Sequence, residues 1–365
     1  MRTWPFLIIA LCLVLGTEAS RPYFTLPPLV IYSDGNLDDA LATLHALADD
    51  EYRVVGICAG GTGFSSADDG AETALRLIES VASRIDDADK AQSLRNIIVS
   101  KGSSTPLGSS VNLNTSILNV QAPPIRFLSG NLWGTRDIYF PTKGDLQVSS
   151  LSCTEMMEQI LEDEFYRITL LSTGTDTDVA QLYRSVPLMF ARTNQILRMG
   201  GALNVPGNIF TVPGNTVAEF NLYLDPLASD EVLRHDRSFL VPLDATNHVP
   251  ITQNFLDQLE PIDTLTANYT FAYLSVVRQA FGDAAFFAGY YLWDDLAYQV
   301  LLNGYCETQD WKSLSVDTTL GPNDPSGELY VNTRLPGYDR ERVCLELDTV
   351  KLENQILHWL EYVAV

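Results

Sequence analysis

The chain has 365 residues, of which 46% are hydrophobic and 19% are charged, so it can bury a large core as one big or two modest domains. Its formal net charge of −23 excludes a nucleic-acid polymer as a natural partner, because phosphate backbones bind basic surfaces. A small neutral substrate or a bound cation suits this charge better.

The N-terminal residues 1–19 have the pattern of a secretory signal peptide. Arg2 gives a positive start, residues 6–15 form an apolar core, and residues 17–19 resemble a cleavage site. The apolar core is shorter than the roughly 20 residues that a membrane span needs, and no later segment is long and apolar enough. We therefore predict no membrane association and a mature domain at 20–365, exported to the extracellular space or to a compartment of the secretory pathway.

Export permits disulfides and glycosylation. Cleavage of the leader leaves four cysteines, for which three pairings are possible: Cys58, Cys153, Cys306 and Cys344. We predict a bridge between Cys306 and Cys344, which both lie in the loop-rich C-terminal part, and a buried free thiol at Cys58, which lies in an apolar run. No Cys/His cluster suits zinc. Glycosylation acceptor motifs start at Asn114 and Asn268.

Short apolar runs alternate with helical patterns along the chain. The expected strands are 29–33, 53–59, 96–100, 167–172, 195–199 and 237–242. The expected helices are 38–49, 66–84, 152–163, 177–184, 227–234, 252–258 and 290–301. This alternation predicts a single α/β domain with a doubly wound, mostly parallel, mixed sheet and helices on both faces. The span 102–150 is rich in Ser, Gly, Pro and Asn, and a loop of that length is usually functional or mobile.

An acidic loop follows the first expected strand, with Asp34, Asn36, Asp38 and Asp39 around a glycine. A helix dipole offsets only about 0.3–1 kcal/mol per carboxylate, which is too little to gather three of them without a cation. The loop also lies where open α/β sheets bind ligands. An EF-hand is excluded, because its sixth position should be Gly and is Asp39. We interpret the loop as a hard-metal site; the alternative is a solvated, helix-capping turn.

Three later segments offer further polar groups. Thr173 ends an expected strand and exposes backbone carbonyls at the same sheet edge. Glu219 and Asn221 alternate with apolar residues, so both would point one way if extended, which suits sugar hydroxyls; the alternative is loop capping. Asp294 begins a helical pattern and is either a fourth oxygen ligand or an N-cap. No Ser-His-Asp set is recognisable.

Taken in order, these segments resemble the nucleoside hydrolase family, from about residue 29 to residue 301. The family's DxDxxxDD motif corresponds to Tyr32 through Asp39. The DGNLDD form, and the spacing from Asn208 to Glu219, are similar to the purine-specific inosine–adenosine–guanosine branch. The resemblance implies a Rossmann-like fold, cleavage of the N-glycosidic bond of ribonucleosides, and a homodimer or homotetramer.

The resemblance also implies a Ca²⁺ ion as cofactor. Its ligands would be Asp34, both carboxylate oxygens of Asp39, the backbone carbonyl of Thr173, and Asp294, with water and ribose hydroxyls completing the coordination. Asp34 would also be the general base for the attacking water. Five residues would hold the ribose hydroxyls: Asn36, Asp38, Asn208, Glu219 and Asn221.

Trp293 stands where the inosine–uridine branch has a histidine, and it resembles the purine branch, which sandwiches the base between two indoles. Such stacking raises the basicity of a purine nitrogen, so that the base takes a proton from solvent. Trp133 is the candidate second indole, and Tyr290 or Tyr291 would close the site. The alternative for Trp293 is a purely structural packing role.

Two positions depart from the family pattern. Tyr32 replaces the first Asp of the motif, which removes a carboxylate near the metal. Thr62 stands where the family has an Asn or Asp that orients the nucleophilic water, and we expect its hydroxyl to take that role. These departures keep open the alternative of a catalytically weak Ca²⁺-dependent nucleoside- or sugar-binding protein. A pyrimidine or broad-specificity nucleosidase is the other alternative.

Overall fold

A computed structural model describes most of the chain after its N-terminal segment. The described residues are 22–107, 134–164, 167–187, 192–209, 212–235, 238–319, 321, 323, 325–333 and 341–362. The expected signal peptide, Asn114 and Trp133 lie outside these ranges, so the predictions made for them stay predictions.

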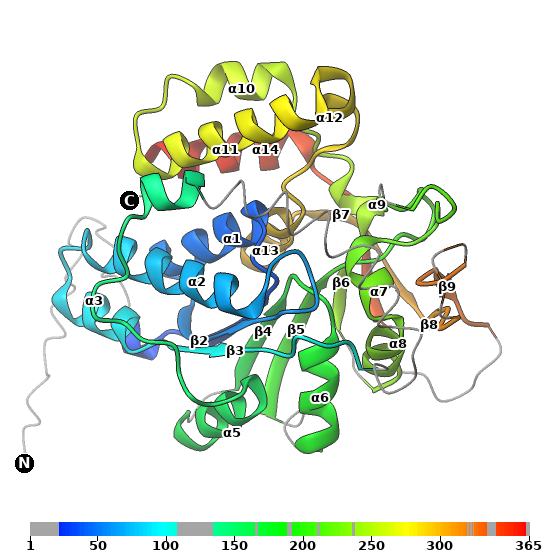
Figure 1. The fold of residues 1–365 in the computed structure, drawn as a ribbon, viewed down its shortest axis with the longest axis horizontal. Coiled ribbons are helices and arrows are strands. Elements are labelled where there is room, and N and C mark those ends of the chain that lie inside the picture. Colours follow the sequence, from blue (N-terminus) through cyan, green and yellow to red (C-terminus); the bar gives the residue numbers. More distant parts are fainter. Residues whose placement is uncertain are drawn as a thin grey trace, which may run out of the picture.

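An eight-stranded sheet forms the centre of the fold, in the order β3-β2-β1-β4-β5-β6-β10-β7 (Figure 1). Its strands are β1 Pro28–Ser33, β2 Arg53–Ala59, β3 Ile98–Lys101, β4 Ile168–Ser172, β5 Thr193–Met199, β6 Phe239–Val241, β7 Cys306–Lys312 and β10 Glu341–Leu347. All neighbours are parallel except β10 and β7. The predicted doubly wound, mostly parallel sheet is therefore confirmed. A separate two-stranded sheet pairs β8 Leu314–Val316 with β9 Leu329–Val331.

Helices cover both faces of this sheet (Figure 1). One face carries α1 Leu37–Ala48, α2 Ala67–Ala82 and α13 Trp293–Asn303, with α3 Ala88–Arg95 beside them. The other face carries α5 Cys153–Asp163, α6 Thr177–Ser185 and α8 Pro226–His235. An outer group comprises α10 Gln253–Leu259, α11 Leu265–Phe281, α12 Asp283–Gly289 and α14 Thr349–Tyr362, and the short α7 Phe220–Leu224 and α9 Leu243–Thr246 lie near the sheet edge. Within the described residues, no helix has both the length and the apolar character needed to cross a bilayer.

Strand β1 shows how the sequence divides the core between the two faces. Leu29 and Ile31 pack into the cluster on the α1 side, whereas Val30 and Tyr32 pack into the cluster on the α5 side. A strand buried on both faces is a near-continuous apolar run, which is why it could be recognised in the sequence.

The structure contains two disulfides within its described residues. Cys306 and Cys344 are bonded, as predicted, with Cα atoms 5.7 Å apart on neighbouring strands β7 and β10. The prediction of a free thiol at Cys58 is wrong, because Cys58 is bonded to Cys153 with Cα atoms 5.4 Å apart. The fold brings the start of α5 onto β2, and the apolar surroundings of Cys58 bury a disulfide rather than a thiol.

Candidate active site

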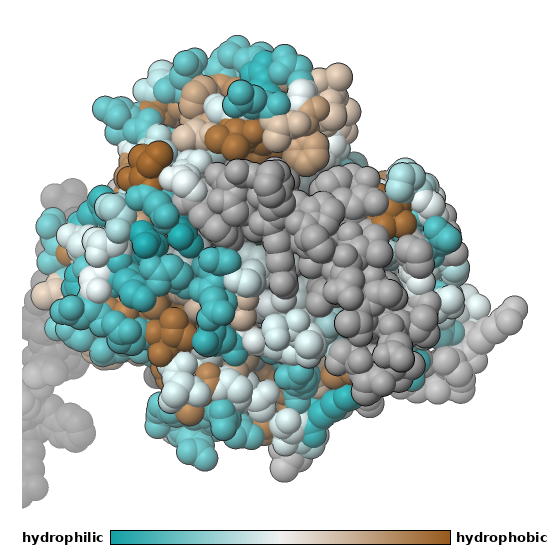
Figure 2. All heavy atoms as spheres, in the orientation of Figure 1, coloured by the Kyte–Doolittle hydropathy of each residue, from teal (hydrophilic) through white to brown (hydrophobic). Residues whose placement is uncertain are grey.

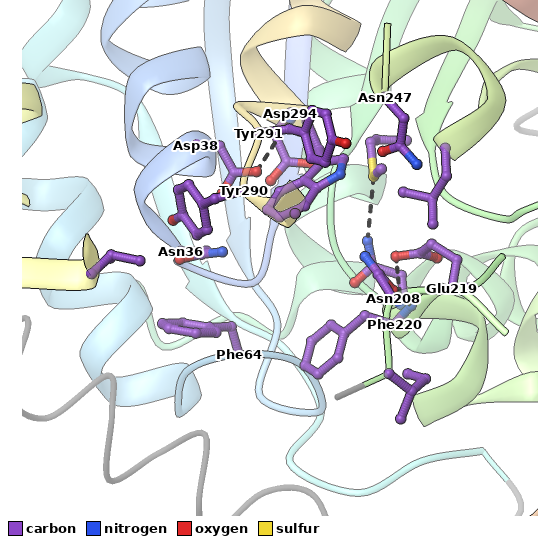
Figure 3. Close-up of a pocket in the computed structure, with 18 of the residues that line it drawn as sticks. Asn36, Asp38, Phe64, Asn208, Glu219, Phe220, Asn247, Tyr290, Tyr291 and Asp294 are labelled. Atoms are coloured by element: carbon purple, nitrogen blue, oxygen red, sulfur yellow. Dashed lines mark hydrogen bonds between the residues drawn. The ribbon is translucent and has the colours of Figure 1, made fainter. Parts of the chain in front are cut away.

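The strand order reverses between β1 and β4, so the loops that follow these two strands share one edge of the sheet. Ligands bind at such a switch point in open α/β sheets. A cavity of about 530 Å³ lies there (Figure 3). Its lining includes most of the residues singled out in the sequence: Asp34, Asn36, Asp38, Thr173, Asn208, Glu219, Asn221, Tyr290, Tyr291, Trp293 and Asp294.

A cluster of buried carboxylates forms one end of the cavity. One oxygen from each of Asp38, Asp39 and Asp294 lies within 4.8 Å of the others. Asp39 is held by the backbone N–H groups of Asp34 and Asn36, at 3.2 and 3.0 Å. The bond from Asn36 is half of a capping box that begins α1, so the helix start fixes the carboxylate.

Asp34 lies beside this cluster, between two loops. Its Oδ2 accepts a hydrogen bond of 3.0 Å from the backbone N–H of Phe64, and its side chain is 4% exposed. Burial and the adjacent Asp39 charge raise the pKa of Asp34 well above its usual range. A cation bound nearby would therefore lower the pKa of Asp34 and favour its ionised form.

Two carboxylate oxygens of the cluster, Asp38 Oδ1 and Asp294 Oδ1, are buried without a hydrogen-bond partner among the described residues. Burial and the neighbouring Asp39 raise the pKa of Asp38 to about 8, and burial together with Asp38 raises the pKa of Asp294 well above its usual range. Buried unpaired oxygens of like charge are costly unless a cation joins them. The donor set, all oxygen, fits a hard divalent cation.

A second polar group faces the cavity from α7. Glu219 is the N-cap of this helix and accepts from the backbone N–H of Asn221 at 2.9 Å and of Gly201 at 3.0 Å. Asn221 Nδ2 donates to the carbonyl of Thr173 at 3.0 Å, and its buried Oδ1 has no partner in the described chain. The extended geometry considered for Glu219 and Asn221 is therefore wrong, since Asn221 is helical. Both side chains line the same cavity because Glu219 caps α7 and Asn221 lies in its first turn.

Burial raises the pKa of Glu219 to about 7. The Asn208 side chain accepts from the backbone N–H of Phe220 at 2.8 Å, which holds it on the same side of the cavity as Glu219 (Figure 3). Carboxylate and amide groups together can donate to and accept from sugar hydroxyls.

Aromatic side chains form the other wall of the cavity. The ring of Trp293 lies 5.3 Å from that of Tyr290 and 5.5 Å from that of Tyr291. Helix α13 begins at Trp293 rather than at residue 290, so the two tyrosines belong to the preceding loop. Apolar side chains also gather on the surface over α11 and α12, where Phe281, another lining residue, is 38% exposed (Figure 2).

Several lining residues were not predicted from the sequence, and Tyr273 has the clearest polar contact among them. Its hydroxyl donates to Asn36 Oδ1 at 3.0 Å. It lies on α11, which was not expected to be a helix. Asn247, after α9, also lines the cavity, and its buried Oδ1 has no partner in the described chain. Had α11 been recognised as a helix, the position of Tyr273 on its cavity-facing side would have been the signal for this residue.

Four predicted positions are not lining residues of the cavity. Asp39 lies behind the lining, where its carboxylate belongs to the cluster with Asp38 and Asp294. Tyr32 points into the apolar cluster on the α5 side, where its hydroxyl has no partner among the described residues. Thr62 is fully buried and bonds to Thr175 and Thr177. Its water-orienting role stays a prediction. Asn268 lies in the first half of α11 and donates to Asp263 at 3.2 Å.

Comparison with known proteins decides the family. The profile of the family described as "Inosine-uridine preferring nucleoside hydrolase" matches residues 29–354. The chain belongs to this family. It is thereby assigned to the enzymes that hydrolyse N-glycosyl bonds of ribonucleosides, and the cavity at the switch point is the candidate active site of this nucleoside hydrolase.

Individual relatives differ in the substrates that their names state. The pyrimidine-specific ribonucleoside hydrolase RihA of Salmonella newport is 28% identical over 247 residues, which cover 66% of this chain and 69% of RihA. Nucleoside hydrolase 3 of Arabidopsis thaliana is 30% identical over 155 residues, or 36% of this chain, and the match spans only 17% of that longer protein.

Solved structures share the fold. A plant nucleoside hydrolase superposes with a TM-score of 0.72 at 21% identity, covering 92% of this chain and 99% of that one. A purine-preferring ribonucleoside hydrolase from Gardnerella vaginalis gives 0.71 at 20% identity, covering 92% and 98%.

Proposed function

We propose that this nucleoside hydrolase cleaves purine ribonucleosides to free base and ribose, and that it requires Ca²⁺. One observation carries the proposal. The carboxylate cluster with unpaired buried oxygens and the ring of Trp293 line the same cavity. A cation site beside an aromatic wall is what a substrate with a polar sugar and a flat base requires.

The cation would be held by Asp34, Asp39, Asp294 and the carbonyl of Thr173. Asp38, whose Oδ1 is also unpaired, lies within reach of the same ion. A bound Ca²⁺ supplies positive charge that offsets the clustered carboxylates and makes a nearby water more acidic. The all-oxygen donors support Ca²⁺ over metals that prefer nitrogen or sulfur.

Asp34 is the proposed general base. It takes a proton from the water that attacks the anomeric carbon. The backbone N–H of Phe64 donates a hydrogen bond to Asp34 Oδ2 and so orients the carboxylate. Glu219, Asn221 and Asp38 grip the ribose hydroxyls on both sides of the sugar. Contacts that strengthen as the ring flattens toward an oxocarbenium-like state turn binding energy into rate.

Trp293 is the proposed stacking surface for the leaving base. Its ring lines the same cavity as the carboxylate cluster and lies within 5.5 Å of the rings of Tyr290 and Tyr291, so a base that stacks on it stays next to the bound sugar. Stacking supports protonation of a purine nitrogen from solvent. In the described lining of the cavity there is no Lys, Arg or His that could protonate the base directly.

A pyrimidine nucleosidase is the second candidate, because the similarity to RihA favours it. Ribose release from inosine, adenosine, guanosine, uridine and cytidine separates the two. We expect the highest kcat/KM for a purine nucleoside. A preference for uridine or cytidine would contradict the purine proposal and support a pyrimidine nucleosidase. Calorimetric binding of inosine without any turnover would show that the protein binds nucleosides but does not hydrolyse them.

We also propose that the protein is exported. The two disulfides support this, since such bonds persist in oxidising compartments. N-terminal sequencing of protein recovered from the medium of expressing eukaryotic cells should find a start near residue 20. Protein that stays in the cell with an intact N-terminus would contradict export.

A further inference from the structure

A chain of buried hydroxyl groups joins the loop after β2 to the loop after β4. Thr62 follows β2, and its Oγ1 lies 2.5 Å from Thr175 Oγ1 and 3.0 Å from Thr177 Oγ1, both of which follow β4. Thr177 Oγ1 donates in turn to Asp225 Oδ2 at 2.6 Å. Thr62, Thr177 and Asp225 are fully buried, so water does not compete for these bonds.

The carboxylate of Asp225 sets the direction of this chain. It also accepts from the backbone N–H groups of Leu107, at 2.7 Å, and Ala228, at 3.2 Å. Burial raises the pKa of Asp225 to about 6, while these three hydrogen bonds oppose the rise, so at pH 7 the carboxylate is mostly ionised and acts as an acceptor. Each hydroxyl has one proton, so Thr177 gives its own to Asp225, Thr62 gives to Thr177, and Thr175 gives to Thr62. Thr62 is the middle member, bonded on both sides.

The loops that this chain joins enclose Asp34. A Cβ added to Gly63 would lie 2.1 Å from Asp34 Oδ2, and one added to Gly174 would lie 2.9 Å from Asp34 Cβ. Both loops therefore touch the Asp34 side chain through bare backbone. Thr62 directly precedes Gly63, and Thr175 directly follows Gly174, so their hydrogen bond closes the two loops around the carboxylate.

We propose that Thr62 is a positioning residue for Asp34: its hydroxyl locks the loop after β2 to the loop after β4 and thereby fixes the orientation of the Asp34 carboxylate. The catalytic meaning of this orientation rests on the proposed function, whereas the locking itself does not. The short Thr side chain reaches Thr175 and Thr177 instead of the cavity, where it is not a lining residue.

Three variants test the lock through activity. Thr62→Val keeps the shape and removes both hydrogen bonds, Thr62→Ser keeps the hydroxyl, and Thr169→Val is a matched control. Thr169 is a buried threonine on β4 whose Oγ1 has no partner in the described chain. Misplacement by about 1 Å can cost ~10²-fold, so we expect kcat for inosine to fall about 10- to 100-fold in Thr62→Val, with KM unchanged. Thr62→Ser and Thr169→Val should stay near wild type.

Hydrogen exchange measured by mass spectrometry gives a second readout that needs no turnover. The peptide covering residues 60–66 should exchange faster in Thr62→Val and at the wild-type rate in Thr62→Ser and Thr169→Val. Thr175→Val removes only one of the two bonds between the loops, so we expect a smaller change in the same direction, even if Thr62→Val fails to fold.

Unchanged exchange of residues 60–66 in both Thr62→Val and Thr175→Val would overturn the proposal, as would a loss of kcat that Thr62→Ser does not rescue. A wild-type protein that hydrolyses no nucleoside, with faster exchange in Thr62→Val, would overturn the proposed function and leave the lock standing.

Discussion

The carboxylate end and the aromatic wall of the cavity are built in different ways. Asp34 and Asp39 are buried and held by backbone N–H groups from the ends of the strands and the start of α1. Tyr290, Tyr291 and Trp293 are only half-buried, and their rings contact one another and, through Tyr290, the ring of Phe286. The sheet edge thus fixes the reactive groups, whereas side-chain packing alone shapes the surface that meets the base. We expect changes at the first to abolish all turnover and changes at the second to alter which base is accepted.

The largest effect is expected for Asp294→Asn. A cation contributes several kcal/mol of transition-state stabilisation, so kcat/KM should fall about 1000-fold, equivalent to roughly 4 kcal/mol, for purine and pyrimidine nucleosides alike. The matched control is Asp295→Asn, because Asp295 does not line the cavity and contacts His45 at 3.2 Å instead. Calorimetric titration with Ca²⁺ should show weakened binding only in Asp294→Asn. If Asp294→Asn kept more than a tenth of the wild-type activity, Asp294 would not be a ligand of the cation.

A smaller, selective effect is expected for Trp293→Ala. Stacking of a base on an aromatic ring contributes about 1–3 kcal/mol, so kcat/KM for inosine should fall about 5- to 150-fold while Ca²⁺ affinity is unchanged. Trp293→Phe, which keeps a ring, should restore most of the activity. If Trp293→Ala also lost Ca²⁺ binding and the thermal stability of the wild type, the indole would have a structural packing role.

The third effect is on stability rather than on rate. At a Ca²⁺ concentration of about 100 times Kd, binding stabilises the folded state by roughly 2.7 kcal/mol, which should raise the Tm by several degrees. The shift arises at the carboxylate end, so differential scanning fluorimetry should find it in Trp293→Ala but not in Asp294→Asn. An equal shift in both variants would place the ion elsewhere.

The carboxylate end could be predicted from the sequence because its information is local. Asn36 and the apolar spacing of Leu37, Leu41 and Leu44 mark the start and face of α1, and the acidic residues fall within that short stretch. Glu219 and Asn221 were predicted to lie on one side of a common site, and both line the cavity, although the expected extended conformation was wrong. A helix cap brings neighbouring polar groups together as an extended strand does.

The contribution of α11 to the cavity was less predictable than the carboxylate end. Helix α11 is rich in aromatic and β-branched residues, such as Tyr269, Thr270 and Val277, which favour strands, so the helix and with it Tyr273 were missed.

The bond between Cys58 and Cys153 spans 95 residues and depends on how α5 packs on β2. Such contacts are set by the tertiary fold, which no local pattern reports.

The central claim is that a divalent cation and Asp34 together drive hydrolysis of a purine ribonucleoside. The most direct test is ribose release from inosine by the wild type with Ca²⁺, after EDTA treatment, and after Ca²⁺ is restored, alongside Asp34→Ala with Ca²⁺. We predict loss of activity in EDTA, recovery with Ca²⁺, and a rate at least about 100-fold lower in Asp34→Ala, as expected for removal of a general base. Full activity in EDTA or in Asp34→Ala would contradict the claim.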